Sequence, residues 1–188
     1  KTYVTQLHKV YNEMQQAFLQ EITDKNALNL KEAGLTTDEA VVNFMKKRFK
    51  VIQDCEDKFE PCFADEYSSM DGSERGSLVN GTRNPYSSCY TIASGASICL
   101  GELSTENEEQ LSGALYVDIN GQNGPNIVGR DVFAVYVYEN GIIDDYGASA
   151  PVSKDDRENN FESTCIGTAA DWYGCFGKIL NDNWEMTY

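Results

Sequence analysis

The sequence predicts an α+β fold in which a long N-terminal helix packs on an antiparallel sheet of three or four strands. Apolar residues recur at steps of three and four over residues 1–22, which is the period of an amphipathic helix. Several runs between residues 88 and 144 instead alternate with a period of two, as half-buried strands do. Helices followed by a run of strands are typical of α+β folds. Apolar residues make up 41% of the chain, enough for one core, so we treat residues 1–188 as a single domain.

The first helix is predicted from one apolar stripe. The stripe consists of Val4, Leu7, Tyr11, Met14, Phe18 and Ile22. The pattern already runs at Val4, with no clear capping position ahead of it, so we expect a helix truncated at its start whose natural segment extends upstream. An ordinary N-terminal helix with a frayed first turn is the alternative. We expect the later turns to lie on the sheet and the first turns to project from it.

A second helix is predicted over residues 36–54. Thr36 and Glu39 form a capping-box pattern, and an apolar face follows. That face consists of Val41, Met45, Phe49 and Ile52. Residues 60–86 are rich in Ser, Gly and Asn, and we expect an irregular segment over the surface.

The sheet is predicted over residues 88–144. Two alternating runs flank Ser94-Gly95-Ala96, which predicts a hairpin, and reflection about residue 94 places Cys89 opposite Cys99. Strands at 113–119 and 132–138 follow, and a tight turn at Asn140-Gly141 leads to residues 142–144. Residues 145–188 form a C-terminal region with a short helix near 175–180.

The six cysteines favour three local disulfides. They are Cys55, Cys62, Cys89, Cys99, Cys165 and Cys175. Fifteen pairings are formally open. We favour 55–62, 89–99 and 165–175 because each pair closes a turn or a short loop. The sole histidine, His8, and the lack of a C-x-x-C pair disfavour zinc. Three disulfides imply an oxidising compartment, and six free thiols in a cytosolic protein are the alternative.

The charge of the chain argues against a nucleic-acid partner. Thirty acidic residues against fifteen basic ones give a net charge of −15, which repels a phosphate backbone. The one basic run, Lys46-Lys47-Arg48 with Lys50, is interpreted as a solvated helix face.

The most specific motif is the turn-rich stretch Asp118–Phe133, which reads D-I-N-G-Q-N-G-P-N-I-V-G-R-D-V-F. It resembles the sheet-region loop of type IV pilin-like proteins that carry a prepilin-type N-terminal methylation segment, where the pattern is D-x-N-G-x-x-G-P-N-x-x-G-x-D-x-F. The stretch from Tyr3 to Phe18 is similar to the amphipathic half of the spine helix in that family. The ending Cys175–Tyr188 also resembles the family's C-terminus, whereas residues 25–88 show no such resemblance.

The resemblance implies a structural protein of the cell surface. It would be a minor pilin or pseudopilin that assembles through its N-terminal helix into a type IV pilus or a type II secretion filament. Its partners would be other pilin or pseudopilin subunits, and the membrane through a hydrophobic segment ahead of residue 1. It would lie in the cell envelope or an extracellular filament of a bacterium, with a disulfide-bounded C-terminal loop. The alternative is a secreted or surface-anchored binding module that recognises its ligand through residues 60–86.

The same motif raises the question of a calcium site. Asp118, Asn120 and Asp131 offer hard oxygen ligands, and some pseudopilins carry calcium in a sheet loop. An EF-hand is excluded because its sixth position would be Asn123 and its twelfth Gly129. We favour a rigid Asx turn that caps its own backbone, with calcium as the alternative and no other cofactor.

Catalysis is not expected. His8 has no second histidine to work with and is interpreted as a solvated side chain on the polar face of the first helix. The pairs Asp144-Asp145 and Asp155-Asp156 are interpreted as loop residues of an acidic chain, and no glycine-rich segment carries the lysine of a phosphate-binding loop.

Overall fold

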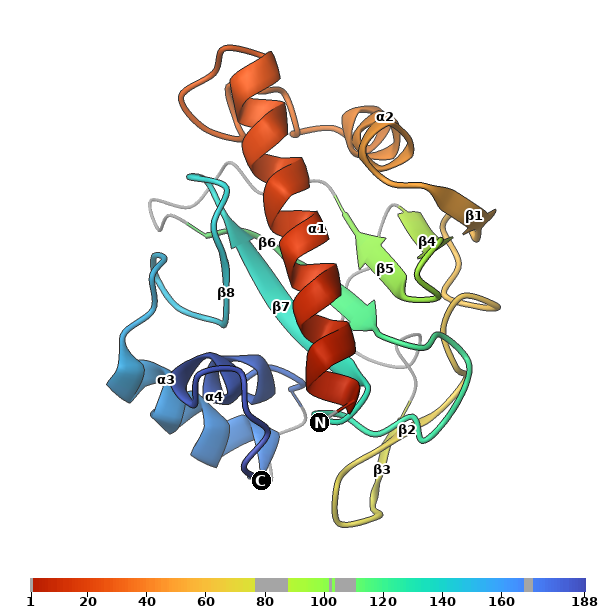
Figure 1. Cartoon of the computed structure of the whole chain (residues 1–188), viewed down its shortest axis with the longest axis vertical. Helices are drawn as coiled ribbons and strands as arrows, with labels where there is room; N and C mark the ends of the chain where they lie inside the picture. Colours follow the sequence, from red (N-terminus) through yellow and green to blue (C-terminus); the bar gives the residue numbers. More distant parts are fainter. Residues whose placement is uncertain (1, 77–87, 102, 104–110, 168–170) are drawn as a thin grey trace.

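The computed structural model describes residues 2–76, 88–101, 103, 111–167 and 171–188. These residues form an α+β fold in which the N-terminal helix α1 lies across an antiparallel sheet, and the C-terminal region packs beside both (Figure 1). The fold class is therefore confirmed. The size of the sheet is not, because it has six strands where three or four were expected.

Helix α1 (Thr2–Asp24) confirms the first predicted helix, but its first turns do not project. Val4 is 7% exposed and Leu7 is fully buried, so the apolar stripe lies in the core from its beginning. The reason is tertiary, since the C-terminal segment folds back against the first half of the helix. Trp184 there contacts the rings of both His8 and Tyr11.

Helix α2 (Asp38–Arg48) is shorter than the predicted span 36–54. Thr37, rather than Thr36, is the N-cap and accepts a hydrogen bond from the backbone N–H of Ala40. After Arg48 the chain becomes extended and forms strand β1 (Val51–Asp54), which pairs with the sheet. The β-branched residues at this point fit either period, and pairing with a neighbouring strand decides for the strand.

The main sheet has the order β1-β4-β5-β6-β7-β8, and all of its neighbours are antiparallel. Beside β1 its strands are β4 (Ser88–Ile92), β5 (Ser97–Leu100), β6 (Leu111–Asp118), β7 (Val132–Tyr138) and β8 (Ile143–Asp144). Cys89 lies opposite Cys99 in the β4–β5 hairpin, as the reflection about residue 94 predicted. At the β7–β8 turn Gly141 has φ +84°, and a Cβ there would meet Ile22 of α1 at 2.9 Å, so the turn requires glycine.

The described part of the predicted irregular segment, residues 60–76, is more ordered than expected. Strands β2 (Tyr67–Ser68) and β3 (Glu74–Gly76) form a separate two-stranded sheet. Phe63 and Tyr67 are almost completely buried, so this segment contributes to the core instead of running over the surface. The remainder of the predicted segment, residues 77–86, lies outside the described residues.

The C-terminal region contains three short helical segments. It comprises α3 (Lys154–Asn160), the π-helical turn η1 (Phe161–Cys165) and α4 (Cys175–Asn181), the last of which confirms the predicted short helix. All three favoured disulfides are present, namely Cys55–Cys62, Cys89–Cys99 and Cys165–Cys175. They indicate an oxidising, extracytoplasmic environment.

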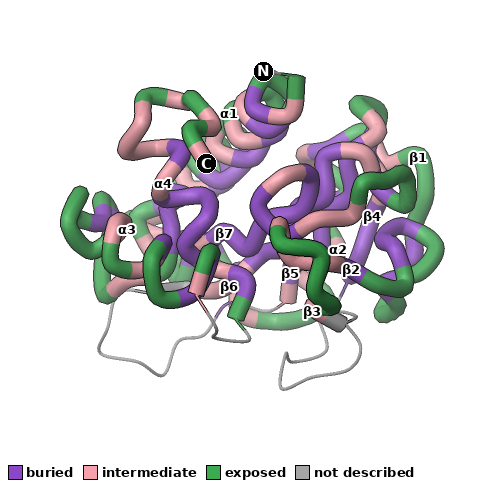
Figure 2. The backbone as a smooth tube through the Cα atoms, turned by 90° about the horizontal axis from the view of Figure 1, so that it is seen from below, coloured by how far each residue is buried: buried purple, intermediate pink, exposed green. Residues whose placement is uncertain are grey.

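The core lies between α1 and the sheet. Figure 2 shows the buried backbone gathered there and the exposed residues at loops and helix ends. Strands β4, β5 and β7 are buried over almost their whole length. Among the described helices, none is long and apolar enough to cross a membrane.

Candidate functional site

The loop between β6 and β7 carries the three predicted ligand residues, and two of them are completely buried. Asp118 ends β6 and Asp131 precedes β7, and neither is exposed to solvent. Tyr67, from β2, donates its hydroxyl to Asp118 Oδ2 at 2.7 Å, and the backbone N–H of Asn120 donates to Asp118 Oδ1 at 3.1 Å. The role of Tyr67 was not predicted, because it lies 51 residues from its partner.

Asp131 folds the second half of this loop back on itself. Its Oδ1 accepts the backbone N–H of Ile127 at 2.7 Å, and its Oδ2 accepts that of Asn126 at 2.8 Å. Asn120 closes the first half by donating from Nδ2 to the carbonyl of Gly124 at 2.9 Å. This is the Asx-type capping that the sequence favoured, with each carboxylate holding backbone N–H groups of its own loop.

Burial sets the protonation of the two carboxyl groups. It raises the pKa of Asp118 to about 8, although the hydrogen bond from Tyr67 opposes the increase. The nearby Asp131 carboxylate adds to it. Burial also raises the pKa of Asp131, against the opposing hydrogen bonds from Ile127 and Asn126. Burial therefore disfavours the state in which both Asp118 and Asp131 are ionised.

The fit of this loop to calcium can be tested on its oxygen atoms. All four carboxylate oxygens already accept hydrogen bonds from the protein. The side-chain oxygens of Asn120 and Asn126 are buried and lack a hydrogen-bond partner. Calcium takes six to eight oxygen ligands, so it would need several others besides these two amide oxygens. In the described part of the chain, no group of three or more His, Cys, Asp or Glu could hold a metal ion. The geometry supports an organising turn.

The apolar stripe predicted to drive assembly is used inside the fold. Val4, Leu7, Met14 and Phe18 are buried in the core. Tyr11 and Ile22 are partly buried against it. What α1 leaves exposed is its polar face, on which Gln6, Lys9 and Gln20 lie.

Two polar side chains fasten α1 to the rest of the molecule. Gln15 donates to the carbonyl of Gly141 at 2.5 Å and accepts the backbone N–H of Ile143 at 3.1 Å, so it holds the β7–β8 turn. Glu21 is 5% exposed and pairs with Arg48 of α2 at 2.9 Å. Arg48 also pairs with Asp24 at 2.7 Å. One residue of the basic run on α2 therefore joins the two helices instead of lying free in solvent.

His8 is not the solvated side chain that was expected. Its ring stacks on Trp184 with centroids 3.9 Å apart and planes only 4° from parallel. Tyr11 and Phe176 complete an aromatic cluster around the same indole. This cluster joins α1 to the C-terminal segment. The apolar pattern of one helix could not predict that role, because it depends on residues more than 160 positions away.

The acidic pair Asp144-Asp145 is a buried structural junction, not a pair of loop residues. Asp144 binds the Arg157 guanidinium through both oxygens, at 3.0 and 2.7 Å. Asp145 accepts the backbone N–H groups of Gly174 and Gly177, at 3.0 and 2.6 Å, and so lies at the N-terminus of α4. Burial raises the pKa of Asp145 to about 6, against these hydrogen bonds. These contacts join β8 to the C-terminal region.

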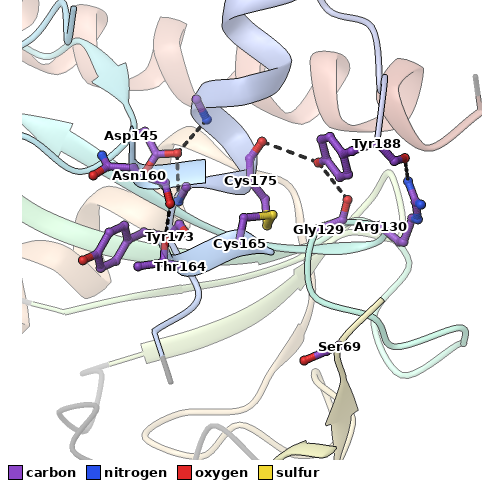
Figure 3. The surroundings of a disulfide bond; sticks show 12 residues. Ser69, Gly129, Arg130, Asp145, Asn160, Thr164, Cys165, Tyr173, Cys175 and Tyr188 are labelled. Carbon is purple, nitrogen blue, oxygen red and sulfur yellow. Dashed lines mark hydrogen bonds between the residues drawn. A yellow bond between two sulfur atoms is a disulfide. The ribbon is translucent and has the colours of Figure 1, made fainter. Parts of the chain in front are cut away.

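The Cys165–Cys175 disulfide joins η1 to the start of α4 and packs against the loop before β7 (Figure 3). Gly129 lies against it with φ +89°, and a Cβ there would meet Cys175 Sγ at 2.8 Å. Tyr188 donates its hydroxyl to the carbonyl of Gly129 at 2.9 Å, and its own carbonyl accepts from Arg130 at 2.5 Å. Gly129 and Arg130 of the sequence motif thus hold Tyr188 in place through hydrogen bonds.

A second arginine, Arg75, links the two-stranded β2–β3 sheet to the backbone beside this disulfide. Arg75 of β3 donates to the carbonyls of Thr164 and Cys165 at 3.0 and 3.2 Å. It also donates to Ser69 at 2.5 Å. Three segments that are distant in sequence therefore meet around one disulfide.

The described geometry is that of a cross-linked scaffold, with its polar contacts directed at the chain's own backbone. Comparisons with protein-family profiles, curated proteins and solved structures gave no match to this chain.

Proposed function

We propose that this chain is the folded headpiece of a filament subunit, a minor pilin or pseudopilin of a type IV pilus or a type II secretion filament. Its activity is assembly with neighbouring subunits, and it is not an enzyme. The observation that carries the proposal is the position of α1, which lies along an antiparallel sheet with its polar face uncovered. This is the arrangement that the resemblance implies, and a disulfide closes the C-terminal region as the resemblance also implies.

The burial of α1 changes how such a headpiece would work. Since the described part of the apolar stripe is packed inside the molecule, it is not available to a neighbour. Contacts between headpieces would instead use the polar face of α1 and the two ends of the molecule. The disulfides and the buried ion pairs keep these surfaces in fixed relative positions, which suits a subunit under mechanical load.

Mapping the N-terminus of the natural protein tests the proposal. The protein is purified from the cells that make it, and its first peptide is sequenced by mass spectrometry. We expect an N-methylated residue that opens a hydrophobic segment ahead of Lys1, and recovery of the protein in the sheared filament fraction. A secretory signal cleaved directly ahead of the domain would support a free binding module instead. Reduced cysteines in a cytosolic fraction would contradict both.

A further inference from the structure

The end of the molecule where α1 meets α2 is its basic end. Residues 25–50 hold six basic and three acidic side chains, a net charge of +3 in a chain of net charge −15. Lys25, Lys31 and Lys47 are exposed there, and within the described part of the chain none of them forms an ion pair. Leu28 lies between the first two and is 83% exposed, which makes it the most exposed of the large apolar side chains in the described residues.

Hydrogen bonds hold the loop around Leu28 at this basic end in place. Leu28 donates its backbone N–H to Glu32 at 3.0 Å, and Glu32 in turn donates its backbone N–H to Asn29 at 2.8 Å. The backbone N–H of Leu30 donates to the carbonyl of Glu139 at 2.9 Å, which anchors the loop to the end of β7. An exposed leucine held by such a loop loses little conformational entropy on binding.

The C-terminal region is the complementary acidic end. Residues 145–188 hold eight acidic and three basic side chains, a net charge of −5. Asp155, Asp156 and Glu162 are exposed, and none of them forms an ion pair with another described residue. Ile166 lies four residues beyond Glu162 and is 56% exposed. Each end therefore combines one exposed aliphatic side chain with an excess of charge of one sign.

Helix α1 separates the two ends. Its last residue, Asp24, is paired with α2, whereas its first half contacts Trp184 of the C-terminal segment. A helix of 23 residues is about 35 Å long, so the two ends lie at opposite poles of the molecule (Figure 1).

We propose that copies of this chain associate head to tail, with the basic end of one copy docked on the acidic end of the next. The inference rests on the proposed function, because it names the surfaces through which such a subunit meets its neighbour. Two copies with the same net charge of −15 repel in most orientations, and this approach brings opposite charges together. Charge complementarity thus selects the register, while Leu28 and Ile166 add apolar contact. A contact between two different patches can repeat from copy to copy, and it generates an open chain of subunits when its rotation does not close a ring.

Sedimentation velocity of the disulfide-intact chain tests this inference without any cell. We expect concentration-dependent association at low ionic strength that is lost at about 1 M salt, where the Debye length is about 3 Å. Carbodiimide cross-linking of mixed 15N-labelled and unlabelled chain should join Lys25, Lys31 or Lys47 of one copy to Asp155, Asp156 or Glu162 of another.

Charge-swap variants make the test specific. Lys25→Glu with Lys31→Glu, and separately Asp155→Lys with Glu162→Lys, should each weaken association about tenfold or more, and an equimolar mixture of the two should restore it. Lys58→Glu is the matched control for Lys31→Glu alone, because each lowers the net charge by two and Lys58 belongs to neither end. A cooperative melting transition confirms that each variant is folded.

The outcomes separate this inference from the proposed function. A chain that stays monomeric at low salt, cross-links elsewhere, or a mixture that fails to recover would overturn head-to-tail docking, even if N-terminal mapping identifies a filament subunit. Recovery in the mixture would support docking, even if the mapping identifies a free module.

Discussion

The buried contact between Tyr67 and Asp118 gives the sharpest test of the structure. The Tyr67 hydroxyl donates to Asp118 Oδ2 at 2.7 Å and accepts the backbone N–H of Ala64 at 3.0 Å. Tyr67→Phe keeps the ring against Trp172 but removes both hydrogen bonds. Since Tyr67 is 1% exposed, water cannot replace the hydroxyl without opening the core.

The cost of Tyr67→Phe should depend on pH. Burial raises the pKa of Asp118 from 3.8 to about 8, so at about pH 6 the folded state holds a neutral carboxyl group. Two neutral hydrogen bonds are then lost, at about 1 kcal/mol each, which gives about 2 kcal/mol. At about pH 9 the carboxylate is charged, and a hydrogen bond to a charged group is worth about 1.5–3 kcal/mol. The total cost should then be about 2.5–4 kcal/mol.

The sign of this effect follows from proton linkage. Because the pKa of Asp118 is higher in the folded state than in the unfolded state, its contribution to stability is fully present below about pH 4 and is lost as the pH rises through about 8. Removing the donor that favours the charged form raises the folded pKa further. The variant therefore loses stability over a wider range of rising pH than the wild type does.

Urea unfolding at about pH 6 and about pH 9, followed by tryptophan fluorescence, measures this difference. Thr164→Val is the control, because the buried Thr164 hydroxyl donates to the neutral carbonyls of Asn160 and Tyr173 and its loss should cost about the same, about 1–2 kcal/mol, at both pH values. An equal cost of Tyr67→Phe at the two pH values, or a larger cost at the lower one, would refute the buried, high-pKa assignment of Asp118.

Three further predictions concern the cross-links and the loop. Cys165→Ser with Cys175→Ser should lower the free energy of unfolding by about 3 kcal/mol in urea titrations, the loop-entropy value for a ring of about ten residues, and an unchanged midpoint would contradict it. Arg157→Met should cost about 3–5 kcal/mol, because it leaves Asp144, 2% exposed, without its partner, and adding Asp144→Asn should recover part of the loss. Calcium at millimolar levels should leave the melting temperature unchanged relative to a magnesium control, whereas a calcium-specific rise that Asp118→Ala abolishes would restore the metal interpretation.

Local patterns predicted the elements whose contacts are local. The apolar stripe predicted α1, and reflection about residue 94 predicted the Cys89–Cys99 pairing, because a hairpin relates its two strands by the turn alone. The predicted end of the second helix is wrong, because Ile52 continues the helical period and yet lies in β1. Whether this segment is helical or extended depends on its pairing with β4, some forty residues further along the chain.

The polar junctions were missed for a related reason. In an acidic chain, Asp144 and Asp145 look like any other loop carboxylates, and only the fold brings Arg157 and the N-terminus of α4 to them. The capping role of Asp131 could be predicted because its partners lie four and five residues away. The contact from Tyr67 to Asp118 could not, because no period or spacing links two residues 51 positions apart.

The way α1 is fastened bears on how force would pass through the molecule. Arg48 holds its C-terminal end, Gln15 holds its middle to the β7–β8 turn, and Trp184 covers its first half. Each of these contacts joins the helix to a different part of the chain, and the Cys165–Cys175 disulfide locks the last of these parts in place. A pull on α1 is therefore shared by the sheet and by both poles. If copies dock through those poles as proposed, load would pass along the helix from one neighbour to the next without opening the core.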